Sequence, residues 1–320
     1  MPEDEQIDTP SDTPAATDPA PVDSSVDLRG ALPEQIKPRG IAPIWHTLVL
    51  LIGILSYSVW GAIGAQHGTT NPIAPPGGAV HSASTGADHI RLIRYALTAA
   101  LELGIVVWIA FGLRLRKVPF RSLFGEWPKG LNGVTIEILA AAAFWICSMI
   151  VLALCALSWL FIQDRVYEHQ TASPHANSNT AKPKSPEQQQ SEMIKALIEL
   201  APDNGVEIAA WGLLCLVVGF SEELIFRGYF QSQGIALLRN TPIAVLVTAV
   251  VFGSAHGYEG LRGIFLISIF GALFGVLTLL RRNLLPGMIA HCWHDFFTGM
   301  MLALIRANPQ LLEHMNNTPK

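Results

Sequence analysis

Residues 206–230 read VEIAAWGLLCLVVGFSEELIFRGYF, an apolar run that closes on two glutamates and an arginine. A membrane-spanning helix needs roughly 20 mostly apolar residues, and this run meets that length. An ionisable group at bilayer depth is costly, so such groups are rare there and mark functional sites. The stretch therefore predicts a membrane helix that carries Glu222, Glu223 and Arg227 to a polar site.

The whole chain has the composition of a polytopic membrane protein. Half of its 320 residues are hydrophobic and only 14% are charged, whereas a soluble domain usually carries about 25% charged residues. We expect an all-α polytopic helical bundle with about seven transmembrane segments, or eight. The hydrophobic segments lie at about 43–64, 90–113, 133–162, 205–230, 242–257, 261–280 and 284–305.

The fifth of these segments, 242–257, is short for a full crossing. A short apolar helix fits a tilted span, or a span that stops part way where a site opens to water. Near it, residues 191–202 read SEMIKALIELAP, with apolar and charged residues on opposite helical faces. This stretch fits a short amphipathic helix in the membrane interface, or an ordinary extension of the helix that follows.

Composition also divides the chain along its length. Residues 1–40 are acidic, rich in Pro, Ser and Thr, and lack a signal-peptide pattern, so we expect a disordered N-terminal tail. Residues 41–165 hold the N-terminal transmembrane helices, and 166–191 form a polar loop that we expect to be flexible. Residues 192–305 form the transmembrane core that carries the ionisable groups, and 306–320 a C-terminal tail.

Loop charge predicts the orientation in the membrane. Lys and Arg gather before the first segment, in the loop 114–129 and after the sixth segment, whereas 65–89 has neither. Cytoplasmic loops carry the excess of Lys and Arg, so the N-terminus is expected in the cytoplasm. Arg91 and Arg94 at the outer end of the second segment oppose this orientation. We expect an integral protein of the bacterial cytoplasmic (inner) membrane.

The first polar motif is formed by Glu222, Glu223 and Arg227. Glu223 and Arg227 are four residues apart, so they share one helical face and can pair. Glu222 points about 100° away from Glu223 and is left to act as a base or a ligand. The structural alternative is a pair of interfacial glutamates at a helix end.

Two further segments each bring polar groups of their own. The fifth ends in VFGSAHG, which places Phe252 and His256 four residues apart, and the seventh contains His291, His294 and Asp295. A His–Asp pair at this spacing can bind a metal, or can form hydrogen bonds around a reacting carbonyl. The alternatives are a structural or interfacial His256, a His–Asp pair that only stabilises the bundle, and a supporting role for His294.

Three segments, the fourth, fifth and seventh, thus deliver polar groups at similar depth. A glutamate that activates water, histidines that assist it and a polar group for the oxyanion are the parts that amide hydrolysis needs. In their order and spacing they resemble the three motifs of the CPBP family, the CAAX protease and bacteriocin-processing group of intramembrane endopeptidases, also called Abi. The matching motifs are E-E-x-x-x-R at Glu222 to Arg227, F-x-x-x-H at Phe252 to His256 and H-x-x-x-D at His291 to Asp295.

The resemblance covers about residues 205–300 and implies a role for each motif. It implies a membrane-embedded endopeptidase similar to CAAX prenyl protease 2, with a membrane-associated protein or peptide as substrate and no nucleic-acid partner. Glu222 would be the general base, assisted by His256. Glu223 and Arg227 would hold the first motif in shape, and His294 would support the site. His291 and Asp295 would line the oxyanion site or bind metal.

The resemblance leaves metal dependence open. Prenyl-protein proteases of the family usually have Asn where this chain has Asp295. An ionised carboxylate cannot donate a hydrogen bond, so aspartate fits a metal ligand or a residue that orients histidine better than an oxyanion donor. Zinc, if present, would draw its ligands from Glu222, His256, His291 and Asp295. A glutamate-dependent route without zinc is the alternative, and the chain has no H-E-x-x-H.

A non-enzymatic function is the rival hypothesis. The cluster of glutamate and histidine would suit a transporter that handles protons or ions, or an immunity or scaffold protein of the membrane. No internal repeat is evident in the sequence, which weakens the case for an inverted-repeat transporter. The complete set of three motifs favours the endopeptidase, because proton transport does not require these pairs.

Overall fold

The computed structural model describes residues 40–67, 87–172, 186–308 and 310. In these ranges the chain is helical throughout and contains no β-strand beyond one isolated bridge between Gly125 and Asn283. The expected tail at 1–40 lies almost wholly outside them. The prediction of an all-α polytopic bundle is confirmed for the described part of the chain.

Every predicted hydrophobic segment forms a helix. Six helical stretches are long and apolar enough to cross a membrane, and α7, the expected short one, is not. Large apolar side chains such as Val107, Leu139 and Leu213 are exposed on their outer surfaces, as expected of lipid-facing positions. The helices are α1 (Ile44–His67), α2 (Ala87–Leu115), α3 (Gly130–Ala172), α5 (Gly205–Glu222) with its continuation to Leu238, α7 (Thr241–Ala255), α8 (Gly260–Arg281) and α9 (Leu285–Ala307).

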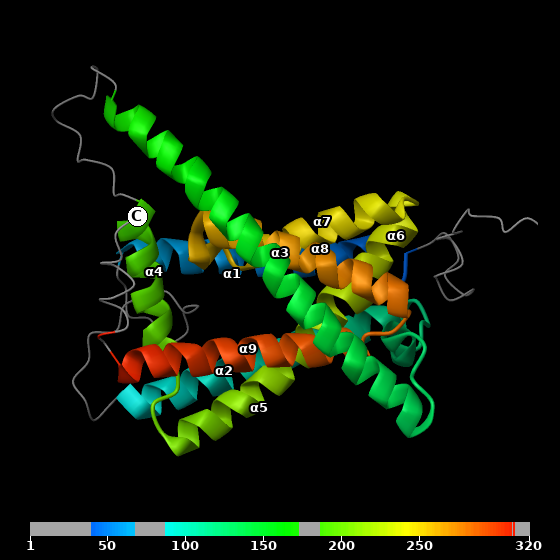
Figure 1. Cartoon of the computed structure of the whole chain (residues 1–320). Coiled ribbons are helices and arrows are strands. Elements are labelled where there is room, and N and C mark those ends of the chain that lie inside the picture. The colour runs from blue at the N-terminus through cyan, green and yellow to red at the C-terminus, as the bar shows by residue number, and fades with distance from the viewer. Residues whose placement is uncertain (1–39, 68–86, 173–185, 309, 311–320) are drawn as a thin grey trace, which may run out of the picture.

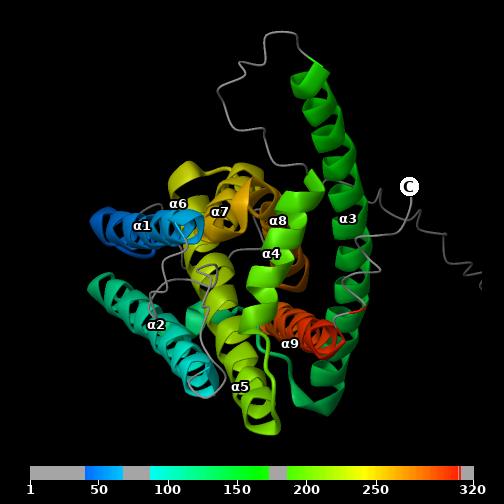
Figure 2. The same cartoon turned by 90° about the vertical axis from the view of Figure 1, so that its left-hand side faces the viewer.

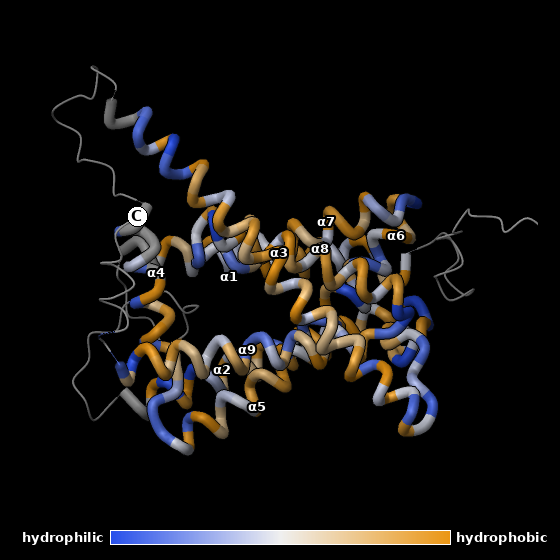
Figure 3. Tube along the Cα trace, in the orientation of Figure 1, coloured by the Kyte–Doolittle hydropathy of each residue, from blue (hydrophilic) through white to orange (hydrophobic). Residues whose placement is uncertain are grey.

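The helices form two groups that α3 crosses (Figures 1 and 2). In one group α7 packs against α8 and α1, and in the other α5 packs between α2 and α9. The long helix α3 contacts α8 of the first group and α9 of the second. The hydropathy view shows apolar residues along the middle of these helices and polar residues toward the ends of the molecule (Figure 3).

The apolar segment suggested that the helix would end near its two glutamates. Instead, the helix that begins with α5 continues well beyond them. Asn204 caps its start by accepting a hydrogen bond from the Glu207 backbone N–H at 3.0 Å. After Glu222 the chain winds as a π-helix from Glu223 to Gln231, labelled η3, and then as α6 (Ser232–Leu238). Glu222 therefore lies in the middle of a 34-residue helix, Gly205–Leu238. Such π-turns within helices are frequently found at functional sites.

The expected flexible loop at 166–191 is partly helical, so its predicted boundaries were wrong. The helix α3 continues to Ala172, and α4 (Pro186–Leu200) begins earlier than expected. Local contacts support the extension of α3: Trp159 donates to Gln163 at 3.2 Å, and the Arg165 guanidinium lies over the Phe161 ring. The amphipathic stretch is a separate helix and not an extension of α5, since a bend at 201–204 divides them.

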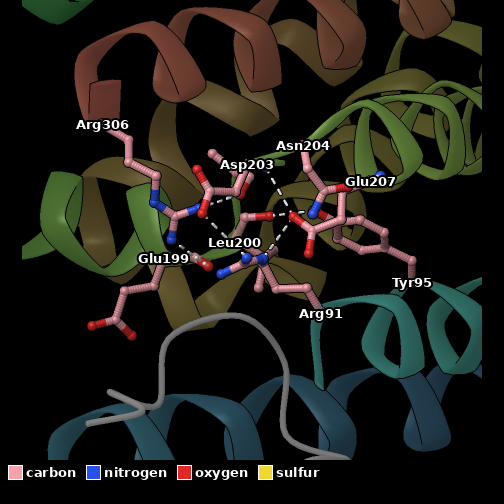
Figure 4. Close-up of polar contacts among 9 residues, drawn as sticks. Arg91, Tyr95, Glu199, Leu200, Asp203, Asn204, Glu207 and Arg306 are labelled. Atoms are coloured by element: carbon pink, nitrogen blue, oxygen red, sulfur yellow. Dashed lines mark hydrogen bonds and ion pairs between the residues drawn. The ribbon is translucent and has the colours of Figure 1, made fainter. Parts of the chain in front are cut away.

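A polar cluster fixes this bend to two neighbouring helices (Figure 4). Glu207 is fully buried, and its Oε2 accepts hydrogen bonds from Arg91 Nε of α2 and from the Asp203 backbone N–H, both at 2.8 Å. From α9, Arg306 donates to the carbonyls of Ala201 and Glu199, while the Tyr95 hydroxyl of α2 donates to that of Leu200. These bonds hold the ends of α2, α4, α5 and α9 together, away from the candidate site.

Candidate active site

The site begins where α5 and α9 approach closely at Gly219. A Cβ atom added there would lie 2.9 Å from the backbone nitrogen of Cys292, which is too short for a real contact. Only glycine therefore allows this approach. One turn farther along α5 lie Glu222 and Glu223, and the neighbouring residue on α9 is His291. The two motifs meet because their helices meet.

Glu223 and Arg227 form the ion pair that their spacing predicted. Arg227 Nη1 donates to Glu223 Oε1 at 2.7 Å, and both side chains are almost completely buried. Space for the carboxylate comes from Gly287 of α9, where an added Cβ would lie 2.9 Å from Glu223 Oε2. A buried charge pair needs further hydrogen bonds to offset its desolvation.

Arg227 obtains these further contacts from α7 and α8. Its Nη2 donates to the Gly271 carbonyl at 3.2 Å. The guanidinium lies between two aromatic rings, 4.4 Å from the centroid of Phe252 and 4.9 Å from that of Phe274. Cation–π contacts of this kind strengthen when water is excluded. Arg227 thus ties the glutamate motif of α5 to the phenylalanine of the second motif.

His291 connects the ion pair to the remaining carboxylates. Its Nδ1 lies 3.0 Å from Glu223 Oε1, the same oxygen that Arg227 contacts. Its Nε2 lies 3.4 Å from Glu222 Oε2 and 3.9 Å from Asp295 Oδ2. The side chain is buried against the rings of Phe270 and Phe274. One nitrogen is therefore used for positioning, and the other faces Glu222 and Asp295.

Glu222 remains separate from the ion pair, as its helical phase predicted. The residue is 9% exposed, and its Oε2 is buried without a hydrogen-bond partner among the described residues. Leaving a buried oxygen unpaired carries a free-energy cost of about 1–3 kcal/mol, more for a charged group. An acceptor in this state is suited to bind a water molecule or a substrate N–H.

His256 lies at the end of α7, where its Nδ1 is 3.0 Å from the Phe252 carbonyl. The Phe252 ring contacts both imidazoles, with centroids 5.1 Å from His256 and 6.1 Å from His291. His256 is within electrostatic range of Asp295 and Glu259. Within the described residues no hydrogen bond joins it to Glu222, so it stands at the edge of the cluster. His294 packs on Phe270, at 4.7 Å between centroids.

One residue near the site was missed by the sequence analysis. Glu102 of α2 lies within electrostatic range of Glu222, His291 and Asp295, and its Oε2 is buried without a hydrogen-bond partner among the described residues. It stands alone in an apolar segment, without a charged residue at helical spacing. Its isolation in that segment was the available signal, because an ionisable residue at bilayer depth is uncommon.

The positions of the four expected zinc ligands give no support to the zinc hypothesis. Nowhere in the described part of the chain do three or more His, Cys, Asp or Glu side chains converge as they would around a metal ion. His256, one of the four expected ligands, is turned toward the Phe252 carbonyl. We therefore derive no step through a metal, and metal dependence remains a matter for experiment.

Comparison with protein families bears on the same helices. Residues 204–297 match the sequence model of a family described as type II CAAX prenyl endopeptidase Rce1-like. The chain carries a Rce1-like region. The match runs from the Asn204 cap of α5 into α9, so the Rce1-like region contains all three motifs, and the suggested resemblance to the CAAX protease family is confirmed. No curated protein and no solved structure gives a significant match.

The Rce1-like region supports a membrane-embedded protease at the level of the family. With the six long apolar helices it makes this chain an integral membrane protein. Helices α1 to α4 lie before the Rce1-like region, and Glu102 is therefore a feature of this chain outside the family match.

Proposed function

We propose that the chain is an intramembrane endopeptidase in which Glu222 activates the water that attacks the scissile carbonyl. The observation that carries the proposal is the environment of Glu222. It is a buried carboxylate with an unpaired oxygen, beside an imidazole whose other nitrogen is fixed by Glu223. A general base must lie within hydrogen-bond reach of the proton that it takes, directly or through one water.

The remaining groups divide the work around that water. Arg227 neutralises Glu223, and Glu223 orients His291, so that Nε2 is directed toward the space between Glu222 and Asp295. In the imidazolium form both ring nitrogens carry protons, so Nδ1 donates to Glu223 while Nε2–H can donate a hydrogen bond to the oxyanion of the tetrahedral intermediate. Asp295 helps to orient the ring. His256, near Asp295, assists in passing the proton from Glu222 to the leaving amine.

Zinc is the alternative source of an activated water. A bound zinc ion would act as a Lewis acid and lower the pKa of its water. Its ligands would have to come from Glu222, His256, His291 and Asp295, which do not converge around a common point in the described part of the chain. The glutamate-dependent route uses only contacts that the site already has, and it is the route that we propose.

Membrane proteomics of the host tests the function without a known substrate. Cells that carry the wild-type chain are compared with cells that carry Glu222→Gln and with cells that carry Glu126→Gln, an exposed glutamate remote from the site. We expect at least one membrane protein to accumulate uncleaved with Glu222→Gln only. Identical fragment patterns in all three strains, at equal expression, would contradict a protease function.

A further inference from the structure

Glu102 lies on the face of α2 that points into the bundle. Tyr95 and Ile109 are buried on α2, and each is seven residues from Glu102. Residues seven apart return to nearly the same face of a helix after two turns. α2 packs against α5 along this face. A glutamate here is therefore directed toward the Rce1-like helices and away from lipid.

The contacts of Tyr95 and Ile109 locate Glu102 along the length of the bundle. Tyr95 packs on Trp211 of α5, and the Trp211 indole donates to the backbone carbonyl of Asp295 at 3.3 Å. Ile109 lies in the same core cluster as Leu224. Glu102 is halfway between them, about 10 Å along the helix from each. This is the level of residues 217–218 of α5, little more than one helical turn from Glu222, and Glu102 interacts electrostatically with Glu222, His291 and Asp295.

The site has more carboxylates than cationic partners. Glu223 already contacts Arg227 and Nδ1 of His291. Glu222 and Asp295 share Nε2 of His291, His256 is also within range of Asp295, and Glu102 has only the more distant interaction with His291. One oxygen of Glu102 and one of Glu222 accept no hydrogen bond in the described part of the chain. An ionised donor satisfies such an oxygen best, because charge-assisted hydrogen bonds are roughly twice as strong as neutral ones.

We propose that Glu102 is a specificity-determining residue that binds a basic side chain, lysine or arginine, of the peptide substrate beside the scissile bond. The inference rests on the proposed endopeptidase function. It adds a substrate class to that function: peptides with a cationic residue within reach of α2. Glu102 would supply the paired charge, and the cation would complete the hydrogen bonding of its buried oxygen.

A binding measurement tests this separately from catalysis. The probes are labelled apolar peptides that carry Lys, norleucine or Glu at one position, and this position is moved stepwise along the peptide. Each peptide is titrated onto detergent-solubilised Glu222→Gln protein. At one position we expect the Lys peptide to bind on the order of tenfold more tightly than the norleucine peptide. Adding Glu102→Gln should remove this preference, Glu102→Lys should reverse it toward the Glu peptide, and Glu126→Gln should preserve it.

Equal binding of the Lys and norleucine peptides at every position would overturn the proposal. So would a Glu102→Gln variant, folded by its melting curve, that keeps the preference. In Glu222-containing protein, Glu102→Gln should raise KM for the Lys peptide alone. An equal fall in kcat for both peptides would assign Glu102 to proton handling and refute the specificity role. If the Lys peptide binds preferentially but protein that retains Glu222 cleaves no peptide, the endopeptidase function is contradicted and the cation site is still supported.

Discussion

His291 is held by Glu223 through a contact of 3.0 Å between Nδ1 and Oε1. The same oxygen accepts a hydrogen bond from Arg227, so the guanidinium, the carboxylate and the imidazole form a continuous chain. A chain of this kind fixes which nitrogen of the ring faces the reaction, as the third member of a catalytic triad does. In the proposed mechanism Glu223 and Arg227 thereby act on the chemistry without touching the scissile bond, and Glu222 is the carboxylate that would contact the water.

Replacing Glu222 with glutamine should abolish cleavage and leave the fold intact. Glutamine keeps the shape of the side chain but cannot take a proton from water, and general base catalysis contributes about 10²–10⁴-fold. Cleavage of a peptide substrate by purified protein should fall by at least about a hundredfold, with an unchanged melting temperature. Near wild-type cleavage by Glu222→Gln would show that another group is the base.

Replacing Arg227 with alanine should reduce stability as well as activity. The change leaves Glu223 buried without its cation, which costs about 3–5 kcal/mol, and it removes the contacts with Phe252 and Phe274. The melting temperature in detergent should fall clearly, whereas Arg282→Ala, which removes an ion pair with an exposed glutamate at 3.9 Å, should leave it unchanged.

The double variant Glu223→Gln/Arg227→Ala separates charge from packing. It removes the uncompensated carboxylate, so part of the lost stability should return, while the empty space beside the two rings remains. Equal melting temperatures for Arg227→Ala and the wild type would show that the pair contributes nothing to the fold.

The Arg91–Glu207 pair should matter for stability and not for the chemistry. Glu207 is fully buried and accepts from Arg91 and from the Asp203 backbone, so Glu207→Ala removes the buried partner of Arg91 and leaves it the exposed Asp203 carboxylate at 3.6 Å. A loss of about 3–5 kcal/mol is expected, together with faster proteolysis at the bend between α4 and α5. Folded Glu207→Ala protein should keep the wild-type kcat. A selective fall in kcat at unchanged melting temperature would link the cluster to the active site.

The sequence was sufficient for features that depend on local periodicity. All seven apolar segments became helices, and the spacing of Glu223 and Arg227 predicted their ion pair. The isolation of Glu222 from Arg227 also followed from helical phase. These features depend on residues within a turn or two of each other, for which the geometry of a helix is known in advance.

Features that depend on contacts between distant helices were not predicted. Helical spacing predicted neither the π-helix winding from Glu223 to Gln231 nor the continuation of the helix from Ser232 to Leu238, beyond the predicted segment 205–230. Glu102 and His291 belong to segments whose relative depth the sequence does not give. The pairing of Arg91 with Glu207 joins residues 116 positions apart, a separation for which helical spacing gives no prediction.

Removing residues 1–35 should leave insertion and catalysis unchanged. Near the start of the described chain, Ile41 is buried in the core, and Ala42 exchanges backbone hydrogen bonds with the Gln233 side chain at 3.1 and 3.0 Å. The truncation leaves these bonds in place, and the composition of the removed segment is too polar to bury much apolar surface. Activity per inserted molecule is the measurement, and a loss of activity would reveal a role in recruiting substrate.

Metal dependence is decided by chelation and elemental analysis of the purified protein. The proposed route uses Glu222, His291 and Asp295 without a metal, and the described residues do not converge in the manner of a zinc site. Activity should therefore survive chelation, with less than about a tenth of an equivalent of zinc in fully active protein, since a resident catalytic zinc would be present near stoichiometrically. Loss of activity on chelation and its return with added zinc would contradict the glutamate-dependent route.

The variant Asp295→Asn distinguishes the two routes further. Without a metal the amide can donate a hydrogen bond to an oxyanion, so the variant should be tolerated. A zinc enzyme would instead lose a charged ligand and bind the metal more weakly.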